Sequence, residues 1–152
     1  MTVKQPQTAK NKILQNAIKL LATREHSRME LQRKLANKGF SATSIATTLQ
    51  KLAADGWQSD ERFAESYIAL RIKSGYGPVK IAYELSNRGI APEIVHKYLP
   101  QESEYWQKQA IKVYNSKFSA KENDYKTRAK QMCFLQSRGF TTEQINFVFK
   151  DV

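Results

Sequence analysis

Residues 55–90 read DGWQSDERFAESYIALRIKSGYGPVKIAYELSNRGI, and their glycines and proline divide them into helices. Gly56 ends a preceding helix, because glycine enters the left-handed conformation beyond a helix C-terminus without steric cost. Gly75 and Gly89 repeat this signal, and Pro78 suits the first turn of a helix, where no amide hydrogen is needed. The pattern predicts one helix between Gly56 and Gly75, a second between Pro78 and Gly89, and a third beyond.

The first of these helices carries its own start signal. Ser59 or Asp60 can cap its N-terminus, since a short polar side chain accepts a hydrogen bond from the first free amides. Phe63, Tyr67 and Leu70 follow at intervals of four and three residues, which is the spacing of one helical face. We therefore expect these three side chains to form the buried stripe of the helix.

The chain repeats itself at an interval of 50 residues, at Gly39, Gly89 and Gly139. A repeat at such a period indicates tandem copies of one supersecondary unit. Each glycine follows one helical pattern and precedes another. Five flanking columns match in all three copies: Leu35, Leu85 and Leu135; Lys38, Arg88 and Arg138; Phe40, Ile90 and Phe140; Ile45, Val95 and Ile145; and Leu49, Leu99 and Phe149.

Each copy also holds an earlier amphipathic helix. Ser27 with Glu30, and Thr141 with Gln144, match the capping box that opens a helix. No segment alternates between apolar and polar residues as a half-buried strand does. The apolar stripes of the earlier helices are Ile13, Leu14, Ala17, Ile18 and Leu21 in the first copy, Phe63, Tyr67 and Leu70 in the second, and Trp106, Ala110, Val113 and Tyr114 in the third.

We therefore predict an all-α fold of nine helices in three tandem three-helix modules, in an elongated, curved arrangement. Units of this size bury little surface alone, so neighbouring modules should share surface. The polar, lysine-rich segment 116–123 is the linker most expected to flex. The predicted boundaries are a flexible N-terminal tail at residues 1–9, module 1 at 10–56, module 2 at 57–100 and module 3 at 101–152.

About a dozen positions within residues 55–90 match a known family in order and spacing. They are Gly56, Asp60, Arg62-Phe63-Ala64, Tyr67, Arg71, Gly75-Tyr76-Gly77-Pro78, Ile81, Leu85 and Gly89-Ile90. The stretch resembles the RecX family, whose members are bacterial regulatory proteins that modulate the RecA recombinase. The residues Trp57-Gln58-Ser59 depart from the family pattern, which usually has Tyr-Leu followed by a polar residue.

The resemblance implies a cytoplasmic protein that binds RecA and RecA–DNA filaments and inhibits recombinase and ATPase activity. Such a protein modulates homologous recombination, DNA repair and the SOS response. Its implied partners are RecA filaments, single-stranded DNA and also double-stranded DNA, with no membrane, no cofactor and no enzymatic activity of its own. A monomer is expected. Capping of filament ends and binding along the filament groove remain alternative mechanisms.

The charge of the chain points to a polyanionic partner. The net charge is +11 and the isoelectric point is near 9.8, which suits nucleic acid or an acidic protein surface. Residues 10–56 carry nine basic and three acidic residues, residues 57–100 carry six and five, and residues 101–152 carry nine and six. No apolar run approaches the roughly 20 residues that a membrane span needs, and residues 1–10 lack the apolar core of a signal peptide.

The sequence offers little for a metal site or covalent chemistry. His26 and His96 lie 70 residues apart, whereas a zinc site needs clustered ligands. The single cysteine, Cys133, excludes an internal disulfide and fits a reducing compartment. Because it lies between Met132 and Phe134 in a helical pattern, we expect it to fill the core.

Basic residues around the turns are the candidate binding residues. Basic side chains beside an exposed aromatic ring suit single-stranded nucleic acid, through phosphate contact and base stacking. On the central loop, basic residues bracket Tyr76, and further basic residues surround the turns of the first and third modules. The full set is Arg71, Lys73, Tyr76, Lys80, Arg88, Arg28, Lys34, Lys38, Arg128 and Arg138.

Two alternatives stay open. Helix, glycine turn and helix is also the outline of a helix-turn-helix, which would make the chain a DNA-binding protein acting without RecA. The second helices begin with residues 41–44, 91–93 and 141–143, which lack the Arg, Asn or Gln that usually read bases. A helical scaffold that binds only protein is the other alternative, and affinity for random single strands separates it from the first.

Overall fold

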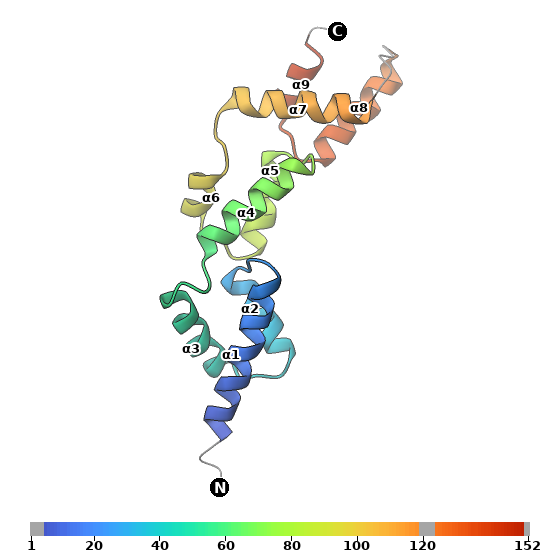
Figure 1. Ribbon diagram of the computed structural model, residues 1–152. Coiled ribbons are helices and arrows are strands. Elements are labelled where there is room, and N and C mark those ends of the chain that lie inside the picture. Colours follow the sequence, from blue (N-terminus) through green and yellow to red (C-terminus); the bar gives the residue numbers. More distant parts are fainter. Residues whose placement is uncertain (1–4, 119–123, 151–152) are drawn as a thin grey trace. The chain divides into compact units, whose positions relative to one another are not determined.

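The computed structural model describes residues 5–118 and 124–150, with the backbone alone for residues 5–9. These ranges contain nine α-helices and no strand, in three successive groups of three (Figure 1). The predicted all-α fold of three-helix modules is confirmed. The helices are α1 (Gln5–Thr23), α2 (Arg28–Asn37), α3 (Ala42–Ala54), α4 (Asp60–Lys73), α5 (Pro78–Asn87), α6 (Pro92–Tyr98), α7 (Ser103–Lys117), α8 (Tyr125–Ser137) and α9 (Thr142–Val148).

The helices begin and end on the signals expected from the sequence. Both capping boxes form. The Ser27 and Thr141 hydroxyls accept from the amides three residues on, and the Glu30 and Gln144 side chains accept from the backbone amides of Ser27 and Thr141. Ser59 Oγ accepts from the amide of Arg62 and so caps α4. Positive φ occurs only at glycine in the described residues, namely at Gly39, Gly56, Gly75, Gly89 and Gly139, as the helix-stop interpretation requires.

The chain forms two compact units. Unit 1 comprises Met1–Ser66 with Arg88–Ala91, and unit 2 comprises Tyr67–Asn87 with Pro92–Val152. The division therefore falls inside α4, and the turn between α5 and α6 belongs to unit 1. Along the described chain, no helix is both long enough and apolar enough to cross a membrane.

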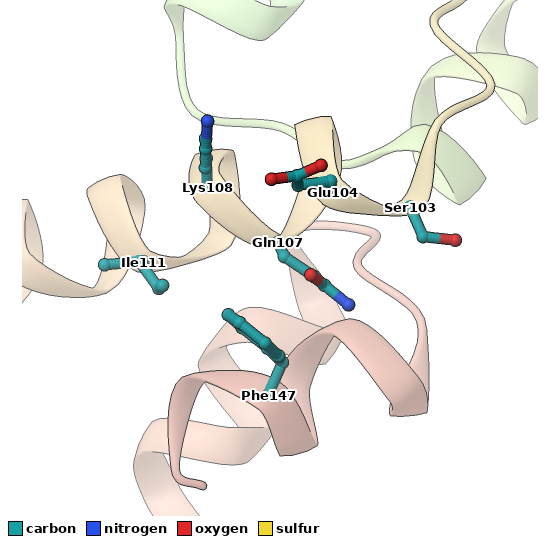
Figure 2. Close-up of a pocket in the computed structure, with 6 residues that line it drawn as sticks. All are labelled: Ser103, Glu104, Gln107, Lys108, Ile111 and Phe147. Carbon is teal, nitrogen blue, oxygen red and sulfur yellow. The ribbon is translucent and has the colours of Figure 1, made fainter. Parts of the chain in front are cut away.

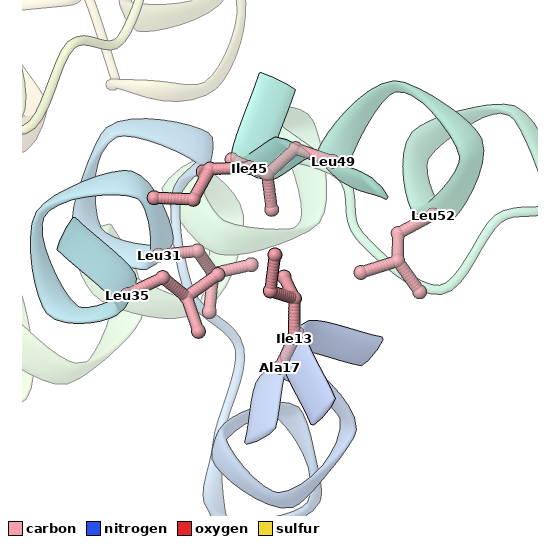
Figure 3. Packing of buried hydrophobic residues seen from close by; sticks show 7 residues of the cluster. All are labelled: Ile13, Ala17, Leu31, Leu35, Ile45, Leu49 and Leu52. Atoms are coloured by element: carbon pink, nitrogen blue, oxygen red, sulfur yellow. The ribbon is translucent and has the colours of Figure 1, made fainter. Parts of the chain in front are cut away.

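The core of unit 1 lies between α1, α2 and α3 (Figure 3). Its seven central side chains are at most 2% exposed, and each large aliphatic side chain buried in this way contributes about 1.5–3 kcal/mol. The apolar stripe expected on α1 faces this core. The seven residues are Ile13, Ala17, Leu31, Leu35, Ile45, Leu49 and Leu52.

The core of unit 2 centres on α7, which packs against α8 and α9. Trp106 is 2% exposed, and its indole N–H donates to the carbonyl of Pro100 over 2.6 Å. Its ring meets Phe140 edge-on, with the centroids 6.5 Å apart. The Tyr114 hydroxyl donates to Oε1 of Gln131 at 3.1 Å, which satisfies an otherwise buried amide.

Two predicted core residues lie at the surface. Leu70 is 60% exposed, because the buried face of α4 runs through Phe63, Ala64 and Ile68 and leaves Leu70 beyond its edge. Cys133 is also exposed, since the inward positions of α8 are Gln131 and Leu135. An apolar residue in a helix pattern was wrongly read as inward in both cases.

Two predicted segments meet the limits of the described residues. Helix α1 begins at Gln5, so the expected tail at residues 1–9 overlaps the first turn of this helix, and residues 1–4 lie outside the described part. In the expected linker at 116–123, α7 continues to Lys117. Residues 119–123 of that linker also lie outside the described part.

Candidate nucleic-acid and partner interface

In unit 2, the loop before α5 lies directly against the turn between α8 and α9. The amide of Gly77 donates to the carbonyl of Arg138 at 2.7 Å, and the amide of Val79 donates to the carbonyl of Gly139 at 2.9 Å. A Cβ on Gly77 would lie 2.5 Å from the carbonyl carbon of Gly139. Glycine at position 77 is therefore required by close backbone approach, and this contact brings two candidate binding segments together.

Three cations converge on the ring of Tyr76 at this contact. Arg71 Cζ lies 3.7 Å from the ring centroid, Arg138 Cζ lies 4.7 Å away, and Lys80 Nζ lies 5.1 Å away. The negative face of an aromatic ring attracts cations at such distances. We call these four residues the Tyr76 cluster. Tyr76 itself is half-buried, and a base cannot stack on the part of the ring that Arg71 covers.

Arg71 is committed to the fold. Its Nη2 and Nε lie 2.8 and 2.9 Å from the two carboxylate oxygens of Glu84, and Tyr67 donates its hydroxyl to the same carboxylate at 3.0 Å. Burial acts to lower the pKa of Arg71, but the hydrogen bonds and the charge of Glu84 outweigh burial and raise that pKa. This bidentate pair holds α4 against α5 and fixes the guanidinium over the ring.

Arg138 and Lys80 keep donors that the fold does not use. Arg138 Nη1 donates to the carbonyl of Ser74 at 3.3 Å, and Lys80 Nζ donates to the carbonyl of Ser137 at 3.4 Å. Both are single bonds from groups with several N–H donors. Lys73, the last residue of α4, also has an exposed side chain. Arg138 and Lys80 can therefore bind an anion without breaking the contact between the two turns.

In unit 1 the matching turn, 50 residues earlier in the chain, lies against a side chain at the start of α2. A Cβ on Gly89 would lie 2.9 Å from Met29, at the start of α2. Glu30 is the residue of unit 1 that matches Lys80 in the 50-residue repeat. Its Oε1 lies 3.1 Å from Arg24 Nη1, and its Oε2 lies 3.5 Å from Arg88 Nε. Burial acts to raise the pKa of Glu30, but the hydrogen bonds from Arg24 and the Ser27 amide lower it overall.

A buried histidine lies beside this first contact. His26 Nδ1 is 3.1 Å from the carbonyl of Arg24, which can only accept, so Nδ1 carries the proton. Its Nε2 then accepts from Lys34 Nζ at 3.0 Å. Burial lowers the pKa of His26, and the charges of Arg24 and Lys34 act in the same direction, against the Arg24 carbonyl and Glu30. His26 is therefore the neutral acceptor for one of the candidate lysines.

The remaining candidate residues are dispersed. Arg28 has an exposed side chain at the start of α2, and Lys38 Nζ donates to Asn16 Oδ1 at 2.6 Å across α1 and α2. In the third module, Arg128 is half-buried, with its Cζ 5.6 Å from the centroid of Phe149. Of the ten predicted residues, the structure therefore gathers Arg71, Tyr76, Lys80 and Arg138 around one ring.

Comparison with known proteins follows the same three-part division. The models of the first, second and third three-helix domains of RecX match residues 14–52, 59–99 and 103–149. A regulatory protein RecX of Legionella pneumophila is 42% identical over 93% of this chain and 95% of its own. The chain belongs to the RecX family of regulatory proteins. The RecX protein of Chromohalobacter salexigens is 41% identical over 86% of each chain.

Solved RecX structures share the fold. The crystal structure of RecX from Lactobacillus salivarius superimposes with a TM-score of 0.79 over 95% of this chain and 97% of the other, at 20% identity. A second structure, described as regulatory protein RecX, gives a TM-score of 0.81 over 95% of this chain and 74% of the other, at 22% identity. These two structures confirm the fold, and the three family models extend the RecX resemblance from residues 55–90 to residues 14–52, 59–99 and 103–149.

Three residues within the segment 55–90 have structural roles that the sequence did not reveal. Asp60 Oδ1 accepts from the amide of Arg28 at 2.9 Å and from Gln58 Nε2 at 3.0 Å, so it caps α2 in addition to opening its own helix. Gln58 is 4% exposed and also donates to the carbonyl of His26. Glu84, which fixes Arg71, was missed. The only signal in the sequence was its position four residues after Lys80, within the same predicted helix.

A hollow of about 620 Å³ opens between α7 and α9 in unit 2 (Figure 2). Phe147 of α9 faces the side chains of α7 across it. One acid and one base line the hollow, so it does not concentrate charge of either sign. Its lining residues are Ser103, Glu104, Gln107, Lys108, Ile111 and Phe147. Among the described residues, no three His, Cys, Asp or Glu side chains gather as metal ligands would.

Proposed function

We propose that this RecX protein binds RecA–DNA filaments in the cytoplasm and lowers their recombinase and ATPase activity. The Tyr76 cluster makes its main contact with the DNA of the filament. The observation that carries this proposal is the convergence of Arg71, Lys80 and Arg138 on one ring, with Glu84 as the carboxylate that Arg71 binds. Membership of the RecX family and the charge of +11 support it.

The cluster suits phosphate better than bases. Lys80 and Arg138 have spare N–H donors, and phosphate oxygens accept strongly from both groups. The Tyr76 ring is already engaged by Arg71 at 3.7 Å, which leaves less of it for base stacking. Contacts to phosphate fix position without reading sequence. The binding is therefore sequence-independent, as a regulator of filaments on arbitrary DNA requires.

The roles of the cluster residues divide accordingly. Lys80 and Arg138 bind the phosphate, while Tyr76 holds their charged groups in place. Arg71 acts through its pairing with Glu84, which is 17% exposed at the side chain, and stabilises the α4–α5 contact. Replacing Arg71 would therefore damage the fold and DNA binding together, so it is a poor test of the site.

The test is ATP hydrolysis by RecA on single-stranded DNA, titrated with the full-length protein. Wild type should lower the rate, and Lys80→Gln with Arg138→Gln should shift the inhibition curve to at least about tenfold higher protein concentration, or about 1.4 kcal/mol. The matched control is Lys108→Gln with Lys112→Gln, which removes the same charge from exposed positions on α7. No inhibition by wild type would refute the function, and equal shifts in both variants would refute the site.

A further inference from the structure

One large exposed side chain lies within residues 55–90, at a position where this chain departs from the RecX pattern. Gly56 adopts a φ of +82°, Phe63 and Ala64 are buried, and Asp60 caps α2. Trp57 is instead 56% exposed. The other tryptophan of the chain, Trp106, is 2% exposed and hydrogen-bonded, as a core tryptophan should be.

The turn that carries Trp57 is held rigidly. Its amide donates to the carbonyl of Leu52 at 2.9 Å. Arg62 Nη2 donates to the carbonyls of Gly56 and Trp57 at 2.8 and 3.2 Å. Arg62 Nε is in turn fixed by Glu25 Oε2 at 3.1 Å. A large side chain on a fixed backbone loses little conformational freedom on binding, which favours affinity.

The segment of the chain that contains Trp57 is acidic in a basic protein. Residues 55–66 contain four carboxylates, from Asp55, Asp60, Glu61 and Glu65, and one guanidinium, so their net charge is −3, whereas the chain carries +11. Asp55 and Glu65 have exposed side chains. The exposed carboxylates of this segment would repel phosphates and attract lysine and arginine side chains.

We propose that Trp57 and the acidic segment 55–66 form a docking surface for a protein, namely the RecA subunits of the filament rather than its DNA. The inference rests on the proposed function, because it takes the filament as the partner. The complementary site is an apolar recess with basic side chains at its edge. Tryptophan at the centre of a polar rim is a common anchor of protein interfaces. The chain thus meets the filament's protein through unit 1 and its phosphates through unit 2.

The test compares two affinities for each full-length variant: affinity for an oligothymidine, and affinity for RecA filaments assembled on it. Trp57→Ala should weaken filament binding at least about tenfold, as expected for a central anchor, and leave oligothymidine affinity unchanged. Tyr125→Ala, at a site 86% exposed in unit 2, is the matched control and should change neither affinity. Circular dichroism and thermal melting establish that each variant is folded.

A charge reversal sharpens the test, because it predicts opposite signs. Asp55→Lys with Glu65→Lys should strengthen oligothymidine binding, since it adds positive charge, and should weaken filament binding. Equal losses of both affinities in Trp57→Ala would mean that Trp57 stacks on a base, and would overturn the docking surface. Unchanged filament binding in Trp57→Ala would also overturn it. Wild type that fails to bind filaments would overturn the proposed function and the surface with it.

Discussion

The turns after α5 and after α8 occupy matching positions in the repeat, and each lies against the start of a helix, but the charged side chains around them differ. In unit 1, Gly89 lies against the start of α2, and Glu30 neutralises Arg24 and Arg88. In unit 2, Gly139 lies against the start of α5, and Lys80 takes the place of Glu30 beside Arg138. The repeat thus places a glycine turn against the start of a helix twice, and the side chain at the position of Glu30 and Lys80 sets the charge beside the arginine of that turn.

The largest expected effect concerns the glycines. Gly139→Ala places a Cβ 2.4 Å from Lys80 Cβ and 2.6 Å from its backbone nitrogen, whereas Gly39 has open space at a similar φ of +93°. Gly39→Ala should therefore cost only the left-handed conformation, about 1–2 kcal/mol. Gly139→Ala should cost about 1–3 kcal/mol more through overpacking. Chemical denaturation measures both, and equal losses would mean that the unit 2 contact is loose.

The second prediction exchanges the charges of the two contacts. Glu30→Gln keeps a capping box, since glutamine serves that role at Gln144 of this chain, and it removes the carboxylate charge that Arg24 and Arg88 face. Affinity for single-stranded DNA should rise several-fold. Lys80→Glu should lower it, because the new carboxylate would pair with Arg138. An unchanged or lower affinity in Glu30→Gln, measured by fluorescence anisotropy, would show that the first contact does not limit binding.

The third prediction concerns the ring. Tyr76→Phe keeps the negative face that holds Arg138 and Lys80, and should bind DNA as wild type does. Tyr76→Leu removes that face, which contributes about 0.5–2 kcal/mol per cation, and should weaken binding several-fold. An oligonucleotide with abasic sites should bind wild type nearly as well as the intact strand. A large loss with the abasic strand would instead indicate base stacking on Tyr76.

The smallest effect is a pH dependence in unit 1. The pKa of His26 is lowered by burial in the folded state, so the unfolded chain binds more protons near pH 6. The contribution of His26 to the free energy of unfolding is therefore fully present above the unfolded pKa of about 6.5, and it falls as the pH drops below that value. His26→Gln should flatten this dependence between pH 7.5 and 5.5 in thermal melts. A wild-type stability that rises on acidification over this range would contradict the buried neutral imidazole.

The fold was accessible from sequence because its signals are local. Glycine stops such as Gly139, capping boxes such as Ser27 with Glu30, and the 50-residue period each depend on residues close along the chain. Which residues of a helix are buried was harder to predict, since Leu70 and Cys133 fit helical patterns but are exposed. A short apolar spacing can be drawn on more than one face of a helix.

The candidate site was accessible only in part. The basic residues around Tyr76 were predicted, but not which of them the fold engages. Glu84 reaches Arg71 across 13 residues, and Arg138 reaches Tyr76 across 62. Such pairs depend on how α4, α5 and α8 pack, which no local pattern specifies. The sequence shows that the repeat has an acid at Glu30 and a base at the matching position, Lys80. That this difference changes the charge beside the glycine turns became clear only from the structure.

The most direct test of the central claim is the salt dependence of single-stranded DNA affinity. The logarithm of affinity should fall linearly with the logarithm of salt concentration, with a slope of about −0.7 per phosphate contact. Lys80→Gln with Arg138→Gln should make that slope shallower by about 1.4, since two contacts are lost. Lys108→Gln with Lys112→Gln should leave the slope unchanged. Identical slopes for wild type and the Lys80/Arg138 variant would contradict the account.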